Sequence, residues 1–249
     1  MIFQNFNKGG TERVNYGLYE YVPGAEIIFD FGNPTCTSAF NTSRIVYNVG
    51  SANITGSLIP YNNPSATYPT LVSAQYGTMV TRWIPSINNG AYLQWDWNNN
   101  ANQTSIFIYR LNGTQVGPAA EGSPYIANSD SSIKVTGGTS NVVTFYDTSA
   151  TSGGTFSNGV VTSTGNGRNG YNMIVSQANN SNKQYYWQNT SLVSYSETSI
   201  ARQTSAVQTN YFGFQSNFGY LGYLQYPFVL TPKQIRQTYK VFSQRFFVT

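Results

Sequence analysis

The 249-residue sequence predicts an all-β protein: a β-sandwich of two antiparallel sheets with one short C-terminal helix. Short apolar, β-branched and aromatic runs alternate with Gly, Asn and Ser along the chain, which is typical of short strands joined by turns. One open sheet could not bury so many strands, so we expect two packed sheets with Greek-key or jelly-roll topology. A single segment near the C-terminus carries the start signals of a helix.

The strands can be placed from the runs between turn signals such as Asn89-Gly90 and Gly137-Gly138. In order, the expected strands are Ala25–Phe31, Ala91–Trp97, Ser105–Arg110, Ile133–Val135, Val142–Tyr146, Tyr171–Ser176, Tyr185–Gln188, Tyr211–Phe214 and Tyr220–Phe228. The second of these shows clear alternation, with Leu93, Trp95 and Trp97 on one face and Asp96 on the other. The apolar face is expected to pack inward.

The helix is expected from Pro232 to Phe242. Thr231 is a suitable N-cap and proline suits the first helical position. Ile235, Tyr239 and Phe242 then form one apolar stripe. We divide the chain into an N-terminal arm, residues 1–14, and a single domain, residues 15–249.

Both ends of this domain resemble a known family. In the segment 220–239, six residues match the closing pattern of concanavalin A-like, laminin-G-like domains: Gly222, Tyr226, Leu230, Thr231, Ile235 and Tyr239. Gln234 stands where that pattern often has Glu. Residues 27–34, IIFDFGNP, are similar to the opening strand and turn of many microbial and phage members.

Two inner segments extend the resemblance. Residues 169–176 and 185–193 stand where these domains have two further strands, and Asn189 matches a turn in which Thr190 replaces glycine. The resemblance covers about residues 25–245 and implies a concanavalin A-like jelly roll of the lectin and glucanase superfamily. Lectins, glycoside hydrolases, adhesins and proteins of phages and large viruses share this fold, so the fold does not settle the function.

The amino-acid composition excludes several kinds of functional site. Histidine is absent, which removes the usual general base and the usual zinc ligand. The single cysteine, Cys36, cannot form an internal disulfide. Charged residues make up only 9% of the chain, and the net charge of +4 is concentrated in residues 177–249. This balance is too weakly basic for a dedicated nucleic-acid-binding face. No apolar run is long enough for a membrane-spanning helix, so membrane insertion is not expected.

An enzyme is not expected. Hydrolytic relatives use closely spaced carboxylates on one strand, because a nucleophile and an acid must flank one glycosidic bond. Here the carboxylates are scattered, and Glu26 and Asp30 would lie roughly 13 Å apart along a strand. No cofactor is expected. Calcium is the alternative considered, at the oxygen-rich segments 96–100 and 128–130, each of which offers one carboxylate.

Glycan binding requires exposed aromatic faces beside amides and carboxylates. The candidates are Trp187, Tyr185, Tyr186 and Trp83, with Trp187 first because it precedes an expected turn. Aromatic residues are also typical of a β-sandwich core. Trp95 and Trp97 are candidates as well, but they alternate with polar residues, which favours core packing over glycan binding for both.

The basic, aromatic C-terminal end is the candidate assembly surface, through Arg236, Lys240, Arg245, Phe246 and Phe247. We therefore expect a non-enzymatic virion structural protein: a capsid decoration, vertex, fibre or tail component. It would be made in the host cytoplasm, since the start MIFQNFNKGG lacks a secretory signal. Its partners would be other virion proteins or copies of itself in a homo-oligomer, and host-surface glycans.

The alternative is a free, extracellular carbohydrate-binding module or adhesin. A glycoside hydrolase ranks third. A compact cluster of exposed aromatic residues would favour the alternative, whereas a cross-strand carboxylate pair in a groove would favour the hydrolase.

Overall fold

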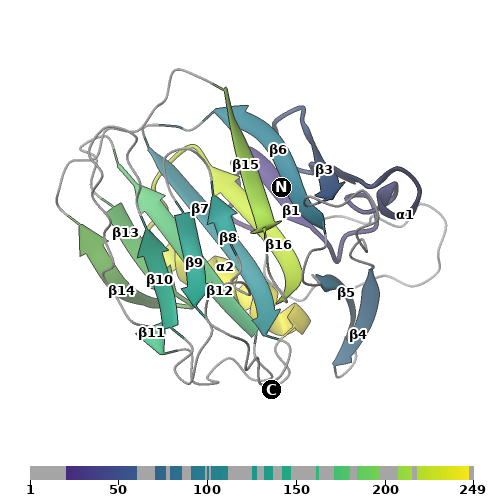
Figure 1. The fold of residues 1–249 in the computed structure, drawn as a ribbon. Helices are drawn as coiled ribbons and strands as arrows, with labels where there is room; N and C mark the ends of the chain where they lie inside the picture. The colour runs from purple at the N-terminus through teal and green to yellow at the C-terminus, as the bar shows by residue number, and fades with distance from the viewer. Residues whose placement is uncertain are drawn as a thin grey trace.

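The computed structural model describes residues 21–60, 71–76, 79–85, 91–98, 100, 102–111, 125–127, 132–136, 142–146, 161–162, 171–179, 184–196, 207–214 and 218–246. Two antiparallel eight-stranded sheets pack face to face, and one long helix lies on the outside of one sheet (Figure 1). The predicted fold class, an all-β sandwich with a C-terminal helix, is confirmed. The predicted N-terminal arm, residues 1–14, lies outside the described residues.

We call the sheet that carries the helix the helix-covered sheet. Its strands run in the order β14-β13-β12-β7-β16-β5-β4, with β1 also paired to β16. Their bounds are β1 Ile27–Asp30, β4 Val72–Tyr76, β5 Met79–Pro85, β7 Gln103–Leu111, β12 Tyr171–Ala178, β13 Gln184–Gln188, β14 Ser191–Ser196 and β16 Phe218–Tyr226.

The other sheet is the outer sheet, with strand order β11-β10-β9-β8-β15-β6-β3-β2. Its strands are β2 Ile45–Tyr47, β3 Thr55–Pro60, β6 Ala91–Asn98, β8 Tyr125–Ala127, β9 Ser132–Thr136, β10 Val142–Tyr146, β11 Val161–Thr162 and β15 Val207–Phe214. The helices are α1 Phe40–Ser43 and α2 Pro232–Phe246. Each expected strand has a counterpart here, whereas β2, β3, β4, β5, β8, β11 and β14 were not expected.

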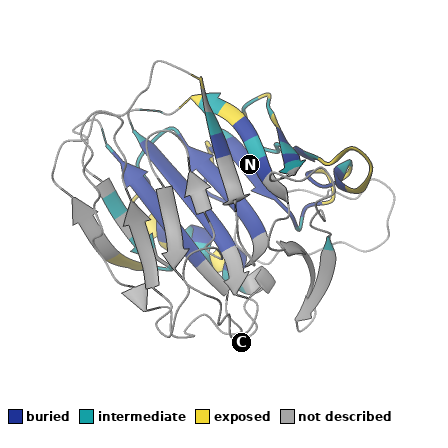
Figure 2. Ribbon diagram, in the orientation of Figure 1, coloured by how far each residue is buried: buried dark blue, intermediate teal, exposed yellow. Residues whose placement is uncertain are grey.

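An inter-sheet core fills the space between the two sheets. The ring of Tyr223 on β16 lies 4.7 Å from the ring of Trp95 on β6 and 4.9 Å from that of Phe107 on β7. Leu93 and Trp95 are buried and Asp96 is exposed, as the alternation in β6 predicted. Among the described residues, the buried ones gather on the central strands (Figure 2).

A second, helix-side core lies between the helix-covered sheet and α2. A β-bulge in β16, between Tyr220 and Gly222, shifts the register against β7. Leu221 therefore joins the helix-side core, while Tyr223 joins the inter-sheet core. A Cβ at Gly222 would stand 3.1 Å from the carbonyl oxygen of Phe29, so glycine allows β1 to approach β16 closely, whereas its 3.6 Å distance to the ring of Phe242 on α2 is an ordinary contact.

Helix α2 begins with a capping box. The backbone N–H of Gln234 donates to Thr231 Oγ1 at 3.3 Å, and the Thr231 N–H donates to Gln234 Oε1 at 2.8 Å. Glutamine thus serves in place of the Glu expected from the resemblance. Ile235 and Phe242 are fully buried, and the helix extends one turn beyond the expected end, to Phe246. Burial raises the pKa of the Tyr226 phenol, which lies in the helix-side core.

The free edge of β1 is closed by a loop instead of a strand. Asn48 uses both halves of its amide: Oδ1 accepts from the N–H groups of Ile28 and Gly50, and Nδ2 donates to the carbonyls of Glu26 and Ala52. The backbone N–H of Ala52 also donates to Glu26 O at 2.9 Å. These bonds fix the residues that precede β1, where the candidate site begins.

Candidate functional site

Three side chains meet at one end of the sandwich, and we call them the rim cluster: Glu26, Trp97 and Asn100. Glu26 Oε2 accepts from Trp97 Nε1 at 3.3 Å and from Asn100 Nδ2 at 3.0 Å. All three side chains are half-buried. The cluster combines one carboxylate, one amide and one indole, which is the chemistry of a polar-ligand site beside an aromatic face.

Long-range pairing brings these residues together. Glu26 is held against β16 by its N–H, which donates to Gln225 O at 2.9 Å, and against the loop by Ala52. A side chain on Gly50 would collide with the carbonyl of Glu26, so this approach requires glycine. Trp97 lies near the end of β6, and Asn100 follows it before β7.

A polar network continues from the rim cluster into the protein. The Asn100 N–H donates to Gln103 Oε1 at 3.0 Å, and Gln103 Nε2 donates to Ser105 Oγ at 2.9 Å. Tyr223 Oη donates to Gln225 Oε1 at 2.7 Å. Gln225 is 1% exposed, and its Nε2 has no hydrogen-bond partner in the described part of the chain.

Trp187, the first of the predicted glycan-binding residues, lies in a different region, on β13. It is half-buried against the helix-side core, and its Nε1 donates to Gln177 Oε1 at 2.7 Å. Tyr185, two residues away on the same strand, is also half-buried. The structure therefore gives Trp187 a packing contact, and its glycan-binding role stays a prediction. The side chains of Tyr186 and Trp83 lie outside the described residues.

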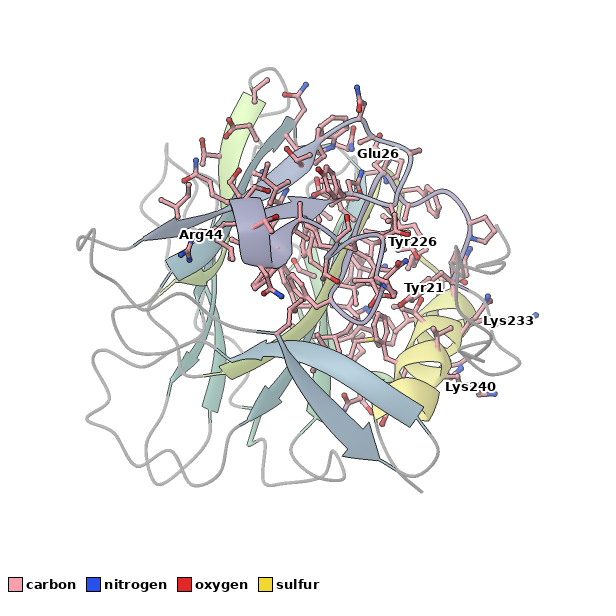
Figure 3. All side chains as sticks on the ribbon, turned by 90° about the vertical axis from the view of Figure 1, so that its right-hand side faces the viewer. Tyr21, Glu26, Arg44, Tyr226, Lys233 and Lys240 are labelled. Carbon is pink, nitrogen blue, oxygen red and sulfur yellow. The ribbon has the colours of Figure 1, made fainter. Side chains whose placement is uncertain are left out.

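Two of the predicted assembly residues have described side chains. Arg236 and Lys240 are exposed on the outer face of α2, together with Lys233. Lys233 and Lys240 project outward from the helix, and Tyr21 and Tyr226 lie on its inner side (Figure 3). The side chains of Arg245 and Phe246, and all of Phe247, lie outside the described residues.

The two carboxylates weighed as a catalytic pair have separate structural partners. Asp30 is 2% exposed and accepts from Tyr21 Oη at 3.1 Å and from the Gly32 N–H at 3.0 Å. Glu26 accepts from the other members of the rim cluster. Burial raises the pKa of the Cys36 thiol well above its ordinary value, and the nearby Asp30 raises it further.

The two segments considered for calcium are only partly described. Asp96 is exposed, and its Oδ1 accepts from Thr209 Oγ1 at 2.8 Å. Residue 99 and the segment 128–130 lie outside the described residues. Where side chains are described, no group of three or more His, Cys, Asp or Glu could hold a metal ion. The described helices include none that is long and apolar enough to cross a membrane.

Sequence reasoning missed the rim cluster. It weighed Glu26 only against Asp30, and for Trp97 it favoured core packing, which the ring does in part, over glycan binding. The run Asp96–Asn100 was noted for its oxygen atoms, which was the available signal. Nothing local to the sequence indicated that Asn100 would bond to a carboxylate 74 positions earlier.

Comparison with known proteins supports the fold. The chain matches no family model and none of the curated proteins searched. It is similar in structure to the binding domain of botulinum neurotoxin serotype D, with 12% identity and a TM-score of 0.59, over 87% of this chain and 51% of that chain. The binding domain of botulinum neurotoxin DC, solved in complex with rat synaptotagmin II, matches with 14% identity and a TM-score of 0.60, over 90% and 52% of the two chains.

A Trypanosoma rangeli sialidase is also similar, with 8% identity and a TM-score of 0.51, over 92% of this chain and 34% of that chain. The chain thus spans about half the length of the neurotoxin domains and a third of the sialidase. At these identities the comparisons establish a shared β-sandwich fold, in agreement with the jelly-roll resemblance at the level of architecture.

Proposed function

We propose that this chain is a non-enzymatic binding domain that serves as a virion structural protein, as a capsid decoration, vertex, fibre or tail component, and contacts host-surface glycans. One observation carries the non-enzymatic part. The buried central strands β1, β7, β12 and β16 contain one carboxylate, Asp30, and its oxygens accept internal hydrogen bonds from Tyr21 and Gly32. A glycosidase needs two carboxylates that face one bond.

The binding part is supported by the fold and by the surface of α2. The neurotoxin domains of similar structure are named as binding domains, one of them in complex with a protein receptor. On this chain, Lys233, Arg236 and Lys240 expose one basic face on a helix whose other face is buried. Such a face complements an acidic protein surface, including one on a neighbouring copy, and repetition in a particle would multiply weak contacts.

Size-exclusion chromatography with light scattering tests the assembly role. We expect the purified chain to form a symmetric oligomer, and Arg236→Glu combined with Lys240→Glu to dissociate it while the melting temperature stays near that of the wild type. Asn41→Glu is the control, because it introduces a negative charge at an exposed residue of α1, outside the basic face of α2. A monomeric wild-type chain would contradict self-assembly.

A free carbohydrate-binding module is the second candidate, favoured by the rim cluster. Glycan binding by a monomer would support it over the virion role. Incubation with a panel of polysaccharides, followed by measurement of new reducing ends, tests the absence of hydrolysis. Release of reducing ends would contradict a non-enzymatic domain.

A further inference from the structure

We infer that the rim cluster is a binding site for a neutral carbohydrate, with Glu26 and Asn100 as acceptors for neighbouring hydroxyl groups and Trp97 as the stacking surface. The inference rests on the proposed function in one respect, that the chain is a binding domain. It places the glycan contact away from β13, where Trp187 bonds internally to Gln177.

Two acceptor atoms of the rim cluster have no partner among the described residues, and they indicate which chemical groups a ligand must supply. Both hydrogen bonds to Glu26 reach the same oxygen, Oε2, so Oε1 has no partner among the described residues. Asn100 donates through its backbone N–H and Nδ2, and its Oδ1 likewise accepts nothing there. Two acceptors without described partners therefore lie on half-buried side chains that are joined by a hydrogen bond between Asn100 Nδ2 and Glu26 Oε2. The hydroxyl groups of a sugar are donors that such acceptors bind.

Trp97 supplies a rigid aromatic surface beside these acceptors. Its ring packs in part against the inter-sheet core, and its N–H is fixed on Glu26. The indole therefore loses little conformational freedom when a ligand binds, and this preorganisation favours affinity. An aromatic face next to a few placed polar groups is the usual composition of a small-ligand site.

The charge of the rim selects against anionic sugars. Glu26 receives its two hydrogen bonds from neutral groups, the indole and an amide, so its negative charge is not neutralised by these contacts. A carboxylate on the ligand would face this charge, and juxtaposed like charges are a common basis of specificity. We therefore expect neutral oligosaccharides to bind better than their sialylated counterparts.

The network behind the rim holds the site in place. Gln103 fixes the Asn100 backbone and is itself bonded to Ser105. At the inner end, Gln225 Nε2 is buried without a partner in the described part of the chain. A buried N–H of this kind is normally satisfied by ordered water, so we expect the network to be hydrated.

The test is binding to an array of neutral oligosaccharides, each paired with its sialylated counterpart, followed by calorimetry on the best neutral ligand. In Glu26→Gln, the amide oxygen can keep both internal donors only by turning its NH₂ toward the ligand. We expect this variant and Asn100→Ala to bind the neutral ligand about tenfold more weakly or worse, since hydrogen bonds to charged groups contribute at least this much. Glu26→Gln should also reduce the preference for neutral over sialylated ligands.

Asp96→Asn is the matched control. It removes a negative charge from the residue next to Trp97, on the opposite face of β6, and should leave binding unchanged. If both rim variants bind the neutral ligand as tightly as the wild type, the rim assignment is wrong while glycan contact elsewhere still stands. If the wild type binds no neutral glycan, the rim assignment also fails, and the light-scattering experiment decides the assembly role independently.

Discussion

Two half-buried tryptophans show how two regions of this protein differ. Trp187 packs on the helix-side core, and its N–H donates at 2.7 Å to Gln177, a side chain only 2% exposed. Trp97 packs on the inter-sheet core, and its N–H donates at 3.3 Å to Glu26, a side chain that is half-exposed. The two residues have the same type, similar burial and the same kind of bond.

The two tryptophans differ in the other hydrogen bonds that their acceptor side chains make. Gln177 Nε2 donates to Thr104 Oγ1 at 3.2 Å and to Leu230 O at 2.8 Å, so its amide is fully used inside the protein. Glu26 keeps one oxygen without a partner among the described residues. We therefore expect the Trp187 region to contribute mainly to stability and the Trp97 region mainly to binding. A tryptophan is better judged by its partner's remaining hydrogen-bonding capacity than by its own exposure.

The largest loss of stability is expected when the helix that covers the helix-side core is disrupted. Ile235 is fully buried there, so Ile235→Asp would bury a charge and lose apolar packing. We expect a loss of about 4 kcal/mol or more in the free energy of unfolding, measured by urea denaturation. Lys233→Asp, an exposed change on the same helix, should stay within about 0.5 kcal/mol. Unchanged melting of Ile235→Asp would reject the packing face assigned to α2.

A second variant tests the region around Trp187 by removing Gln177, the acceptor of the Trp187 N–H. Gln177→Ala would leave the Trp187 N–H and the Leu230 carbonyl without the partner they have here, whereas Thr104 Oγ1 keeps its bonds to Phe228 O and the Leu230 N–H. Each buried polar group left unsatisfied costs about 1–3 kcal/mol, so we expect a total loss near 3 kcal/mol. Urea denaturation measures it. A loss below about 1 kcal/mol would show that water replaces the amide and that this region is less closed than we describe.

The cap of α2 should have a smaller effect. Thr231→Ala removes the hydroxyl that accepts from the Gln234 N–H, and we expect a loss of about 1 kcal/mol. Thr231→Ser retains the hydroxyl and should remain close to the wild type. Thermal melting of the two variants side by side gives the comparison, and equal melting would mean that the capping box does not stabilise the helix.

The smallest stability change is expected at the rim. Glu26→Gln keeps the size of the side chain and one acceptor for Trp97 and Asn100, so the free energy of unfolding should fall by less than about 1 kcal/mol. The same variant is expected to bind the neutral glycan about tenfold more weakly or worse. A stability loss as large as that of Gln177→Ala would contradict the distinction between the two tryptophans.

The sequence was sufficient for features set by near neighbours in the chain. Alternation placed Leu93 and Trp95 inside and Asp96 outside, and the spacing of Thr231, Pro232 and Ile235 located α2 and its buried face. These patterns repeat every two or every three to four residues, so they are readable locally. Several short strands were missed because they lack such a pattern. For example, β3 contains both Gly56 and Pro60.

Features that depend on distant segments could not be predicted. The rim cluster requires residue 26 to meet residues 97 and 100, and Gln177 meets Leu230 only after the sheet has formed. The turn at Asn189 is an instructive case. Asn189 takes φ 54° and its side chain accepts from the Met173 N–H, while Thr190 has no positive φ. The glycine expected from the resemblance is therefore not required at residue 190.

The pairing of β1 with β16 has a consequence for the timing of folding. Ile27 pairs with Gln225 and Asp30 with Gly222, so one of the first described strands is completed by one of the last. During synthesis, both cores must wait until β16 has left the ribosome, and a nascent chain exposes the unpaired edges of β1 and β7 until then. Such a protein is expected to depend on chaperones during translation, and fragments that end before β16 should aggregate.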